Sequence, residues 1–345
     1  MGDHPGGPQP PYPLHPSVVS RIDPVYANFY NEHVADKQQV HLQPVEASRT
    51  SGVLIPGAGP KHPVAKAEDL SIPRSQSTGP DVRIRCFTPD GPKPERGWPC
   101  LFYFHGGGWV LGTIDTENVI ATNLCGRANC VVINVDYRLA PENPYPAAVD
   151  DPWEAVLWAL SDSGKAVLPP IDATKLAVGG SSAGANLAAV MCQRAASQPG
   201  LGLRFAAQLL SVPVADNTAT PETKASWREN ENVPALPAAK MLWYRRHYLP
   251  NEADWAAPEA SPLLWTGDWA RLPPAEVVLG ELDVLRTEGE EFARRLVEAG
   301  ATSTRVTVMK GQPHPFIAMD GVLDSGKLAI TLFVERLLRA FYVEN

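Results

Sequence analysis

The sequence lacks the features that mark membrane, nucleic-acid-binding and zinc proteins. None of its apolar runs reaches the length of a membrane span, and its 345 residues carry a net charge of −8 rather than an excess of lysine and arginine. Cysteine and histidine show no zinc-type spacing, and the motif His-Glu-x-x-His is absent. We therefore expect no membrane span, no nucleic-acid partner, no metal and no cofactor.

Cysteine is scarce, and its five residues are an odd number. All of them lie in strand-like or helix-like runs: Cys86, Cys100, Cys125, Cys130 and Cys192. This placement favours buried free thiols in a reducing compartment over disulfides. Residues 1–16 are rich in proline and glycine and lack the apolar core of a signal peptide, so we expect a cytoplasmic protein. The oligomeric state stays open, a homodimer included.

Strand-like and helix-like runs alternate along the chain. Hydrophobic residues make up 44% of it, which is enough for one large core. The strand-like runs are 100–104, 131–135, 175–179, 205–210, 275–279 and 304–309, and the helical runs are 153–160, 185–192 and 328–341. This alternation predicts one α/β domain with a mostly parallel sheet and helices on both faces.

A tight turn between a strand and a helix is predicted at Gly180-Ser181-Ser182-Ala183-Gly184, which fits the pattern G-x-S-x-G. In this turn the central serine is exposed to the substrate, and its neighbours two positions away must be small. Ser182 meets that requirement. Ser181 does not, because Ala183 stands two positions after it. An ordinary turn is the alternative interpretation of this stretch taken alone.

A glycine-rich loop, His105-Gly106-Gly107-Gly108-Trp109, follows the strand-like run 100–104. Three successive glycines allow backbone N–H groups to approach a ligand oxygen closely. We predict that the N–H groups of Gly107, Gly108 and Ala183 form an oxyanion hole, with Gly106 and Trp109 beside the substrate. The loop fits neither G-x-G-x-x-G nor a Walker motif. We expect His105 to brace the loop through its ring nitrogens.

A serine nucleophile needs a base and an acid, which follow it in the order Ser, Asp/Glu, His. Two histidines come after Ser182, and His314 directly follows a predicted strand, whereas His247 lies in a helix-like stretch. The predicted acid is Asp283, which follows the strand 275–279. Its competitors are Glu281 and Glu288.

With these motifs, the chain resembles the hormone-sensitive lipase family of α/β-hydrolases, which includes many microbial carboxylesterases. The run 136–148, Asp-Tyr-Arg-Leu-Ala-Pro-Glu-Asn-Pro-Tyr-Pro-Ala-Ala, and the segments 260–263 and 283–286 match further motifs of that family in its order. The similarity extends from about Val82 to the C-terminus. It implies an α/β-hydrolase fold with a helical cap, the same triad and the same oxyanion hole.

Three features depart from the pattern of that family, one of which is that the usual run Asp-Pro-Leu-Arg-Asp-Glu-Gly reads Asp-Val-Leu-Arg-Thr-Glu-Gly at 283–289. The residue before the nucleophile is usually acidic or threonine, and here it is Ser181. The base is usually followed by glycine, and here it is followed by Pro315, which fixes the backbone beside the base. Behind the glycine loop, Arg138 is expected to pair with a carboxylate, with Glu142 and Asp150 as the candidates.

The resemblance also suggests how the chain is divided. Residues 64–345 form the catalytic domain, with a cap insertion at about 214–259, and residues 1–63 begin disordered and then contribute to the cap. Five of the nine tryptophans lie between positions 227 and 269. Of these, Trp227 and Trp243 are predicted to face the substrate. Packing within the cap is an equally strong interpretation for any one of them.

The predicted function is hydrolysis of a carboxylic ester with a short to medium acyl chain, through an acyl-enzyme. The expected partner is thus a small-molecule ester. The same machinery would serve a lactone, carbamate or amide, or acyl transfer to a metabolite, because each passes through a tetrahedral oxyanion. A third hypothesis is a small-molecule receptor on this fold, as in the plant gibberellin receptors, which lack the base.

Overall fold

The centre of the molecule is an eight-stranded sheet with the strand order β1-β2-β4-β3-β5-β6-β7-β8. The computed structural model describes residues 10–50 and 56–343. The strands are β1 Lys66–Ile72, β2 Val82–Thr88, β3 Trp98–Phe104, β4 Val131–Asp136, β5 Ile171–Ser181, β6 Ala207–Ser211, β7 Ala275–Leu282 and β8 Arg305–Pro313. Strand β2 runs antiparallel to β1 and β4, and all other pairs are parallel, which confirms the predicted mostly parallel sheet.

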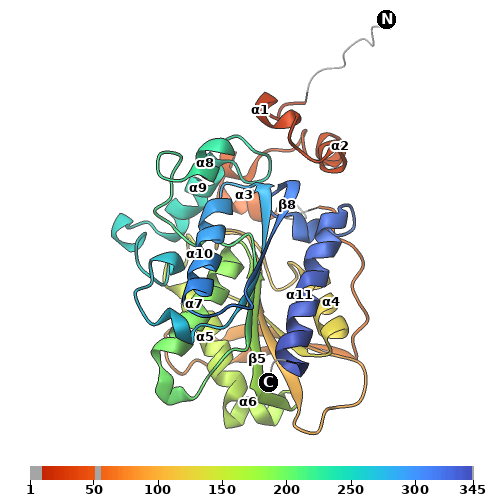
Figure 1. Cartoon of the computed structure of the whole chain (residues 1–345), viewed down its shortest axis with the longest axis vertical. Helices are drawn as coiled ribbons and strands as arrows, with labels where there is room; N and C mark the ends of the chain where they lie inside the picture. The colour runs from red at the N-terminus through yellow and green to blue at the C-terminus, as the bar shows by residue number, and fades with distance from the viewer. Residues whose placement is uncertain (1–9, 51–55, 344–345) are drawn as a thin grey trace, which may run out of the picture.

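Helices cover both faces of this sheet, as the alternating runs predict (Figure 1). One face carries α4 (Asn118–Ala128) and α11 (Asp324–Tyr342), and the other carries α5 (Ala147–Leu160), α7 (Ala183–Ser197) and α10 (Arg286–Glu298). Every residue of β3 is buried, because both of its faces are covered. The short helix α6 (Asp162–Val167) and the 3₁₀ turn η2 (Pro199–Leu201) lie in connections between these elements.

The register of the strands places loops that are far apart in the sequence at the same edge of the sheet. Phe104 lies opposite Gly180, so the glycine loop leaves β3 beside the turn that leaves β5. Leu282 lies opposite Pro313, so the residues after β7 and β8 also emerge together. Because parallel strands present their carboxyl ends at one edge of a sheet, all four loops meet there.

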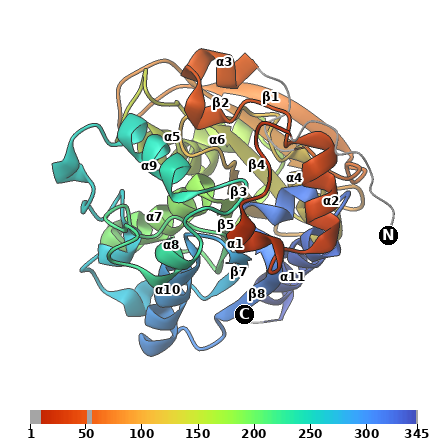
Figure 2. The same ribbon diagram turned by 90° about the horizontal axis from the view of Figure 1, so that it is seen from above.

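Two groups of short helices lie over this edge of the sheet (Figures 1 and 2). The N-terminal group is α1 (Pro16–Val19), α2 (Pro24–His33), η1 (Val40–Leu42) and α3 (Val45–Thr50). The second group follows β6 and contains α8 (Ala225–Glu229) and α9 (Ala238–Tyr248). Further 3₁₀ turns are η3 (Glu252–Asp254), η4 (Pro262–Leu264), η5 (Trp269–Arg271) and η6 (Phe316–Met319).

The N-terminal group is tied to the rest of the molecule by hydrogen bonds. Asp23 caps α2 by accepting from Val25 N at 2.7 Å, and its other carboxylate oxygen accepts from Gln312 Nε2 at 2.7 Å, beside the end of β8. Tyr12 is held as well, since its backbone oxygen accepts from the Tyr30 hydroxyl at 3.0 Å. The disorder expected at the start of the chain concerns residues 1–9 above all, and these lie outside the described part.

Arg138 pairs with a carboxylate, although with neither of the two predicted ones. Its Nη2 lies 2.9 Å from Asp151 Oδ1, because α5 turns Asp151 toward the end of β4 and Asp150 away from it. Arg74 donates to the same carboxylate at 2.7 Å, so two guanidinium groups share one buried acid. Glu142 pairs with Arg49 of α3 instead, at 2.7 Å.

A further expectation concerns the cysteines. All five cysteines lie in the described part, and all are buried and free, as predicted.

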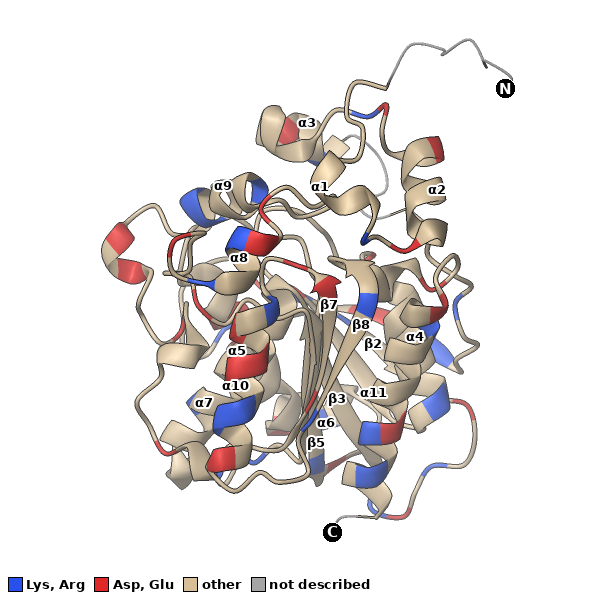
Figure 3. Cartoon of the chain, turned by 45° about the horizontal axis from the view of Figure 1, so that its top comes forward, with Lys and Arg blue, Asp and Glu red and all other residues tan. Residues whose placement is uncertain are grey.

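Acidic and basic side chains stand next to one another on α8 and α10 (Figure 3). Within residues 10–50 and 56–343, no helix is both long and apolar enough to cross a bilayer.

Candidate active site

The chain turns sharply between β5 and α7, and Ser182 stands at that turn. Its backbone has φ 54° and ψ −117°, a conformation that non-glycine residues seldom adopt. Ser182 N donates to Ser211 O at 2.8 Å, which holds the strained turn against the neighbouring strand. Position 184 must be glycine, since a Cβ there would collide with the carbonyl oxygen of Phe104.

A continuous chain of hydrogen bonds links three predicted residues. His314 Nε2 lies 2.9 Å from Ser182 Oγ, and His314 Nδ1 lies 2.8 Å from Asp283 Oδ2. All three side chains are buried. The other carboxylate oxygen of Asp283 accepts from Leu285 N at 2.9 Å, which fixes the plane of the carboxylate. In this arrangement His314 can accept the proton of the serine hydroxyl, and Asp283 can stabilise the resulting imidazolium.

The competing acids and the competing histidine lie elsewhere. Glu281 accepts from Gly311 N at 2.7 Å. Glu288 accepts from Trp227 Nε1 at 3.1 Å, and burial together with the nearby Asp216 carboxylate raises the pKa of Glu288 to about 8. His247 lies on α9, where its ring packs 4.6 Å from that of Trp243.

Three backbone N–H groups beside Ser182 have no acceptor among the described residues. They belong to Gly107, Gly108 and Ala183. Ala183 is the first residue of α7, whose initial N–H groups cannot bond within the helix and carry its positive dipole end. Gly108 has φ 61°, and a Cβ there would collide with the ring of Tyr244. These free donors suit an anionic oxygen.

The glycine loop is braced from behind by His105. Its Nδ1 lies 2.7 Å from Gly106 O, while its Nε2 has no partner within the described part of the chain. The His105 ring stacks on Tyr137 with centroids 4.3 Å apart, and the Tyr137 hydroxyl donates to His105 O at 2.8 Å. Burial lowers the pKa of His105 to about 4, so this ring is neutral near pH 7. One ring nitrogen, rather than both, thus holds the loop.

A residue that the sequence analysis missed supports the nucleophile. The half-buried carboxylate of Glu117 accepts a hydrogen bond from the Ser181 hydroxyl, from 64 residues away. It also accepts from the Tyr103 hydroxyl at 2.8 Å and from Gly106 N at 3.3 Å. Burial raises the pKa of Glu117, and these hydrogen bonds oppose that rise. The acid that usually precedes the nucleophile is therefore replaced here by a serine bonded to a distant carboxylate.

A cavity of about 600 Å³ opens at the triad. Its wall includes Gly106, Gly107, Gly108, Ser182, His314 and Pro315 from the catalytic loops. The N-terminal segment contributes apolar and aromatic side chains, among them Tyr26, Phe29, Tyr30, Val34 and Val40. It also contributes polar ones, which are His33, Lys37, Gln38, Gln39, Gln43 and Ser48. Leu236, Lys240 and Tyr244 come from the segment around α9, and Met319 from η6. A cavity of this size suits a small organic molecule.

Three tryptophans predicted beside the substrate do not line this cavity. Trp109 is fully buried and stacks on Tyr248 with centroids 4.2 Å apart, because its positive φ of 59° turns it away from the glycines. Trp227 is fully buried against Arg245, 5.2 Å from its ring. Trp243 packs on its neighbours within α9. Packing is thus the better interpretation of these residues.

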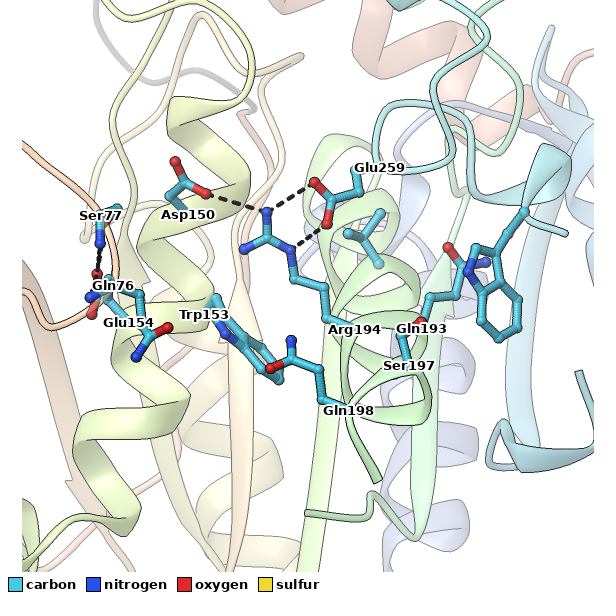
Figure 4. A pocket seen from close by; sticks show the side chains of 12 residues that line it. Gln76, Ser77, Asp150, Trp153, Glu154, Gln193, Arg194, Ser197, Gln198 and Glu259 are labelled. Atoms are coloured by element: carbon cyan, nitrogen blue, oxygen red, sulfur yellow. Dashed lines mark hydrogen bonds and ion pairs between the residues drawn. The ribbon is translucent and has the colours of Figure 1, made fainter. Parts of the chain in front are cut away.

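A second cavity, of about 330 Å³, lies between α5 and α7 (Figure 4). Arg194 points into it and is already paired, at 2.5 Å from Glu259 and 3.2 Å from Asp150. Trp153 and Gln193 are also in its wall. Among the described residues, its walls contain no histidine, cysteine or lysine. Across residues 10–50 and 56–343, no cluster of three or more His, Cys, Asp or Glu could hold a metal ion.

Comparisons with known proteins identify the family and the fold of this chain. Residues 101–318 match the model of a family described as having the alpha/beta hydrolase fold. An AB hydrolase superfamily protein of Schizosaccharomyces pombe is 47% identical over 95% of this chain and 97% of its own length. An arylesterase of Saccharolobus solfataricus is 34% identical over 86% of this chain and 92% of its own. The hyperthermophilic esterase of Pyrobaculum calidifontis superposes with a TM-score of 0.80 at 31% identity, covering 92% and 98% of the two chains.

Proposed function

Since this chain belongs to the α/β-hydrolase family, in its hormone-sensitive lipase branch, we propose that it is a carboxylic ester hydrolase with Ser182 as its nucleophile. The observation that carries the proposal is the hydrogen-bonded series from Ser182 through His314 to Asp283. The esterases among the relatives and structural neighbours support the same reaction class.

The first half of the reaction forms an acyl-enzyme. Ser182 Oγ attacks the ester carbonyl while His314 Nε2 takes its proton, and Asp283 stabilises the imidazolium. The N–H groups of Gly107, Gly108 and Ala183 stabilise the oxyanion of the tetrahedral intermediate. When this intermediate collapses, the C–O bond to the alcohol breaks, and His314 returns the proton to the departing oxygen.

The second half releases the acid. His314 removes a proton from a water molecule, whose oxygen attacks the acyl carbon and forms a second tetrahedral intermediate. The bond to Ser182 Oγ then breaks, and His314 protonates that oxygen. The net reaction consumes one ester and one water molecule and yields one alcohol and one carboxylic acid.

The cap in this proposal consists of two parts, residues up to 63 and the insertion at about 214–259. The N-terminal part contributes the rings of Tyr26, Phe29 and Tyr30 to the cavity, and the insertion contributes Lys240 and Tyr244. A largely apolar cavity of about 600 Å³ favours esters with short to medium acyl chains.

A series of p-nitrophenyl esters from acetate to palmitate tests the proposal, assayed with the native chain and Ser182→Ala. We expect an optimum at short to medium acyl chains and a loss of kcat of about 10⁴- to 10⁶-fold in the variant. Absence of Ser182-dependent turnover on every ester would overturn the proposal and favour a narrow metabolite substrate or a receptor.

A further inference from the structure

Two lysines, Lys37 and Lys240, stand in the wall of the cavity, and Lys240 is the one on the α9 side beside the glycine loop. Lys240 lies in the first turn of α9, one helical turn before Tyr244, whose ring covers Gly108 of the glycine loop. The ammonium of Lys240 is 6.0 Å from the centroid of that ring. Both side chains line the same cavity as Ser182 and His314, so the ammonium shares one space with the catalytic groups.

The hydrogen bonds of this ammonium are incomplete. Lys240 Nζ donates to Ala235 O at 2.7 Å, which occupies one of its three N–H donors. Among the described residues, Lys240 Nζ has no ion pair with a carboxylate. Burial lowers the pKa of Lys240 to about 8, so the side chain remains mostly protonated at pH 7. A half-buried cation that faces a largely apolar cavity without an anionic partner is unfavourable, and an anion entering the cavity would relieve that cost.

The surroundings of Lys240 offer no competing anion. The acid in the cavity wall, Glu117, already accepts hydrogen bonds from Tyr103, Ser181 and Gly106. Helix α9 contains basic residues and no acidic one, and Figure 3 shows it marked in blue alone. The other basic side chains in the wall, His33 and Lys37, lie on the N-terminal segment.

We propose, on the premise that the chain is a carboxylesterase, that its substrates are esters carrying a carboxylate remote from the scissile bond, which binds Lys240 Nζ. The carboxylate replaces the missing partner of the ammonium and accepts the N–H donors that Ala235 leaves free. Lys240 thus acts as a specificity-determining residue, while the carbonyl carbon reacts at Ser182. The carboxylate belongs either to the acyl or to the alcohol part, and two substrate pairs distinguish these arrangements.

Each pair compares an anionic ester with a neutral one of matched shape. Mono-4-nitrophenyl glutarate and 4-nitrophenyl pentanoate differ in the acyl part, whereas 4-acetoxybenzoate and 4-methylphenyl acetate differ in the alcohol part. The readout is the ratio of kcat/KM for the anionic ester to that for the neutral ester. It is measured for the native chain, Lys240→Met, Lys240→Arg and Arg246→Met. Arg246 is exposed on the same helix and outside the cavity wall, so it controls for long-range charge.

We expect Lys240→Met to lower the ratio at least about tenfold for one of the pairs, chiefly through KM, and Lys240→Arg to retain most of it. Arg246→Met should change the ratio less than about twofold. An unchanged ratio in both pairs with Lys240→Met, or an equal loss with Arg246→Met, would overturn the inference while leaving the esterase proposal in place.

A binding measurement distinguishes failure of this inference from failure of the esterase proposal. Calorimetry with monomethyl glutarate and with sodium 4-acetoxybenzoate on Ser182→Ala, with and without Lys240→Met, requires no turnover. We expect the second substitution to weaken binding of one ligand at least about tenfold. Equal affinity of the two proteins for both ligands would contradict a role of Lys240 in recognising the anion.

Discussion

The contact that distinguishes Asp283 from Glu281 and Glu288 as the acid of the triad is its 2.8 Å hydrogen bond to His314. Replacing it with asparagine removes the negative charge that orients the ring and stabilises its protonated form. We expect Asp283→Asn to lower kcat by about 10⁴-fold on p-nitrophenyl butyrate. Glu281→Gln is the matched control, because Glu281 contacts Gly311 and not the triad, and it should stay within about threefold of native. Equal losses in both variants would argue against this assignment.

Glu117 is a positioning residue, because it contacts the neighbours of the catalytic groups rather than the substrate. Its carboxylate holds the Ser181 hydroxyl and the N–H of Gly106, so it joins the nucleophile turn to the glycine loop. We expect Glu117→Gln to lower kcat by about 10- to 100-fold with little change in KM, because small displacements of catalytic groups slow the reaction. The measurement is kcat and KM for p-nitrophenyl butyrate across pH 5–9.

Tyr103→Phe is the control for that variant, since it removes another hydroxyl bonded to the same carboxylate and leaves Ser181 in place. We expect a decrease of less than about fivefold. A loss of kcat in Tyr103→Phe as large as in Glu117→Gln would show that the Glu117 carboxylate contributes to general stability rather than to the nucleophile.

At the scale of secondary-structure elements, helix α5 anchors the loop that follows β1. Glu154 accepts hydrogen bonds from the backbone N–H groups of Ser75, Gln76 and Ser77 at 2.6–2.7 Å. Burial alone would raise the pKa of Glu154, but these bonds and that from the Ser77 hydroxyl lower it from 4.5 to about 2.

This lowered pKa predicts how stability depends on pH. The folded state binds the Glu154 proton more weakly than the unfolded chain, so the stabilisation is complete above pH 4.5 and is lost as the pH falls toward 2. We expect Glu154→Gln to lower the free energy of unfolding by up to about 3 kcal/mol at pH 7 and by little at pH 2. Urea unfolding of the native chain and the variant at a series of pH values measures the difference in the free energy of unfolding at each pH. The exposed Glu298→Gln should cost less than about 1 kcal/mol at any pH, and a pH-independent effect of Glu154→Gln would contradict the mechanism.

Elements were predicted from the sequence where they carry a local signal. The runs 131–135 and 275–279 are strands in the structure because short apolar segments between turns are typical of buried parallel strands. Strand β1 escaped prediction, since most of its side chains are exposed and its sequence is Lys-Ala-Glu-Asp-Leu-Ser-Ile. The triad residues follow strands and could be proposed from that position. Glu117 could not, because its contact with Ser181 depends on the folded topology.

At the scale of the whole molecule, the N-terminal helices complete the cavity. Helix α2 supplies Tyr26, Phe29 and Tyr30 to its wall, and the buried tyrosines also join the core. We expect deletion of residues 1–36 to shift the acyl-chain optimum toward longer esters and to lower kcat/KM for p-nitrophenyl butyrate at least about tenfold, because the apolar wall is lost. The melting temperature should fall as well.

The ester series on the truncated chain measures this shift, and p-nitrophenyl acetate is the internal control. Its acyl group is the smallest of the series, so its kcat/KM should fall less than that of the butyrate. An unchanged acyl-chain profile in the truncated chain would contradict a role of α2 in substrate selection.

The two ends of the described chain lie at opposite poles of the molecule. Helices α1 and α2 stand over the carboxyl edge of the sheet, whereas α11 ends at Tyr342 on the far side (Figure 1). Anchoring this protein to a solid support through its C-terminal end would therefore turn the catalytic face outward to the reaction medium. A tether at the other end would set the support against the entrance used by the ester.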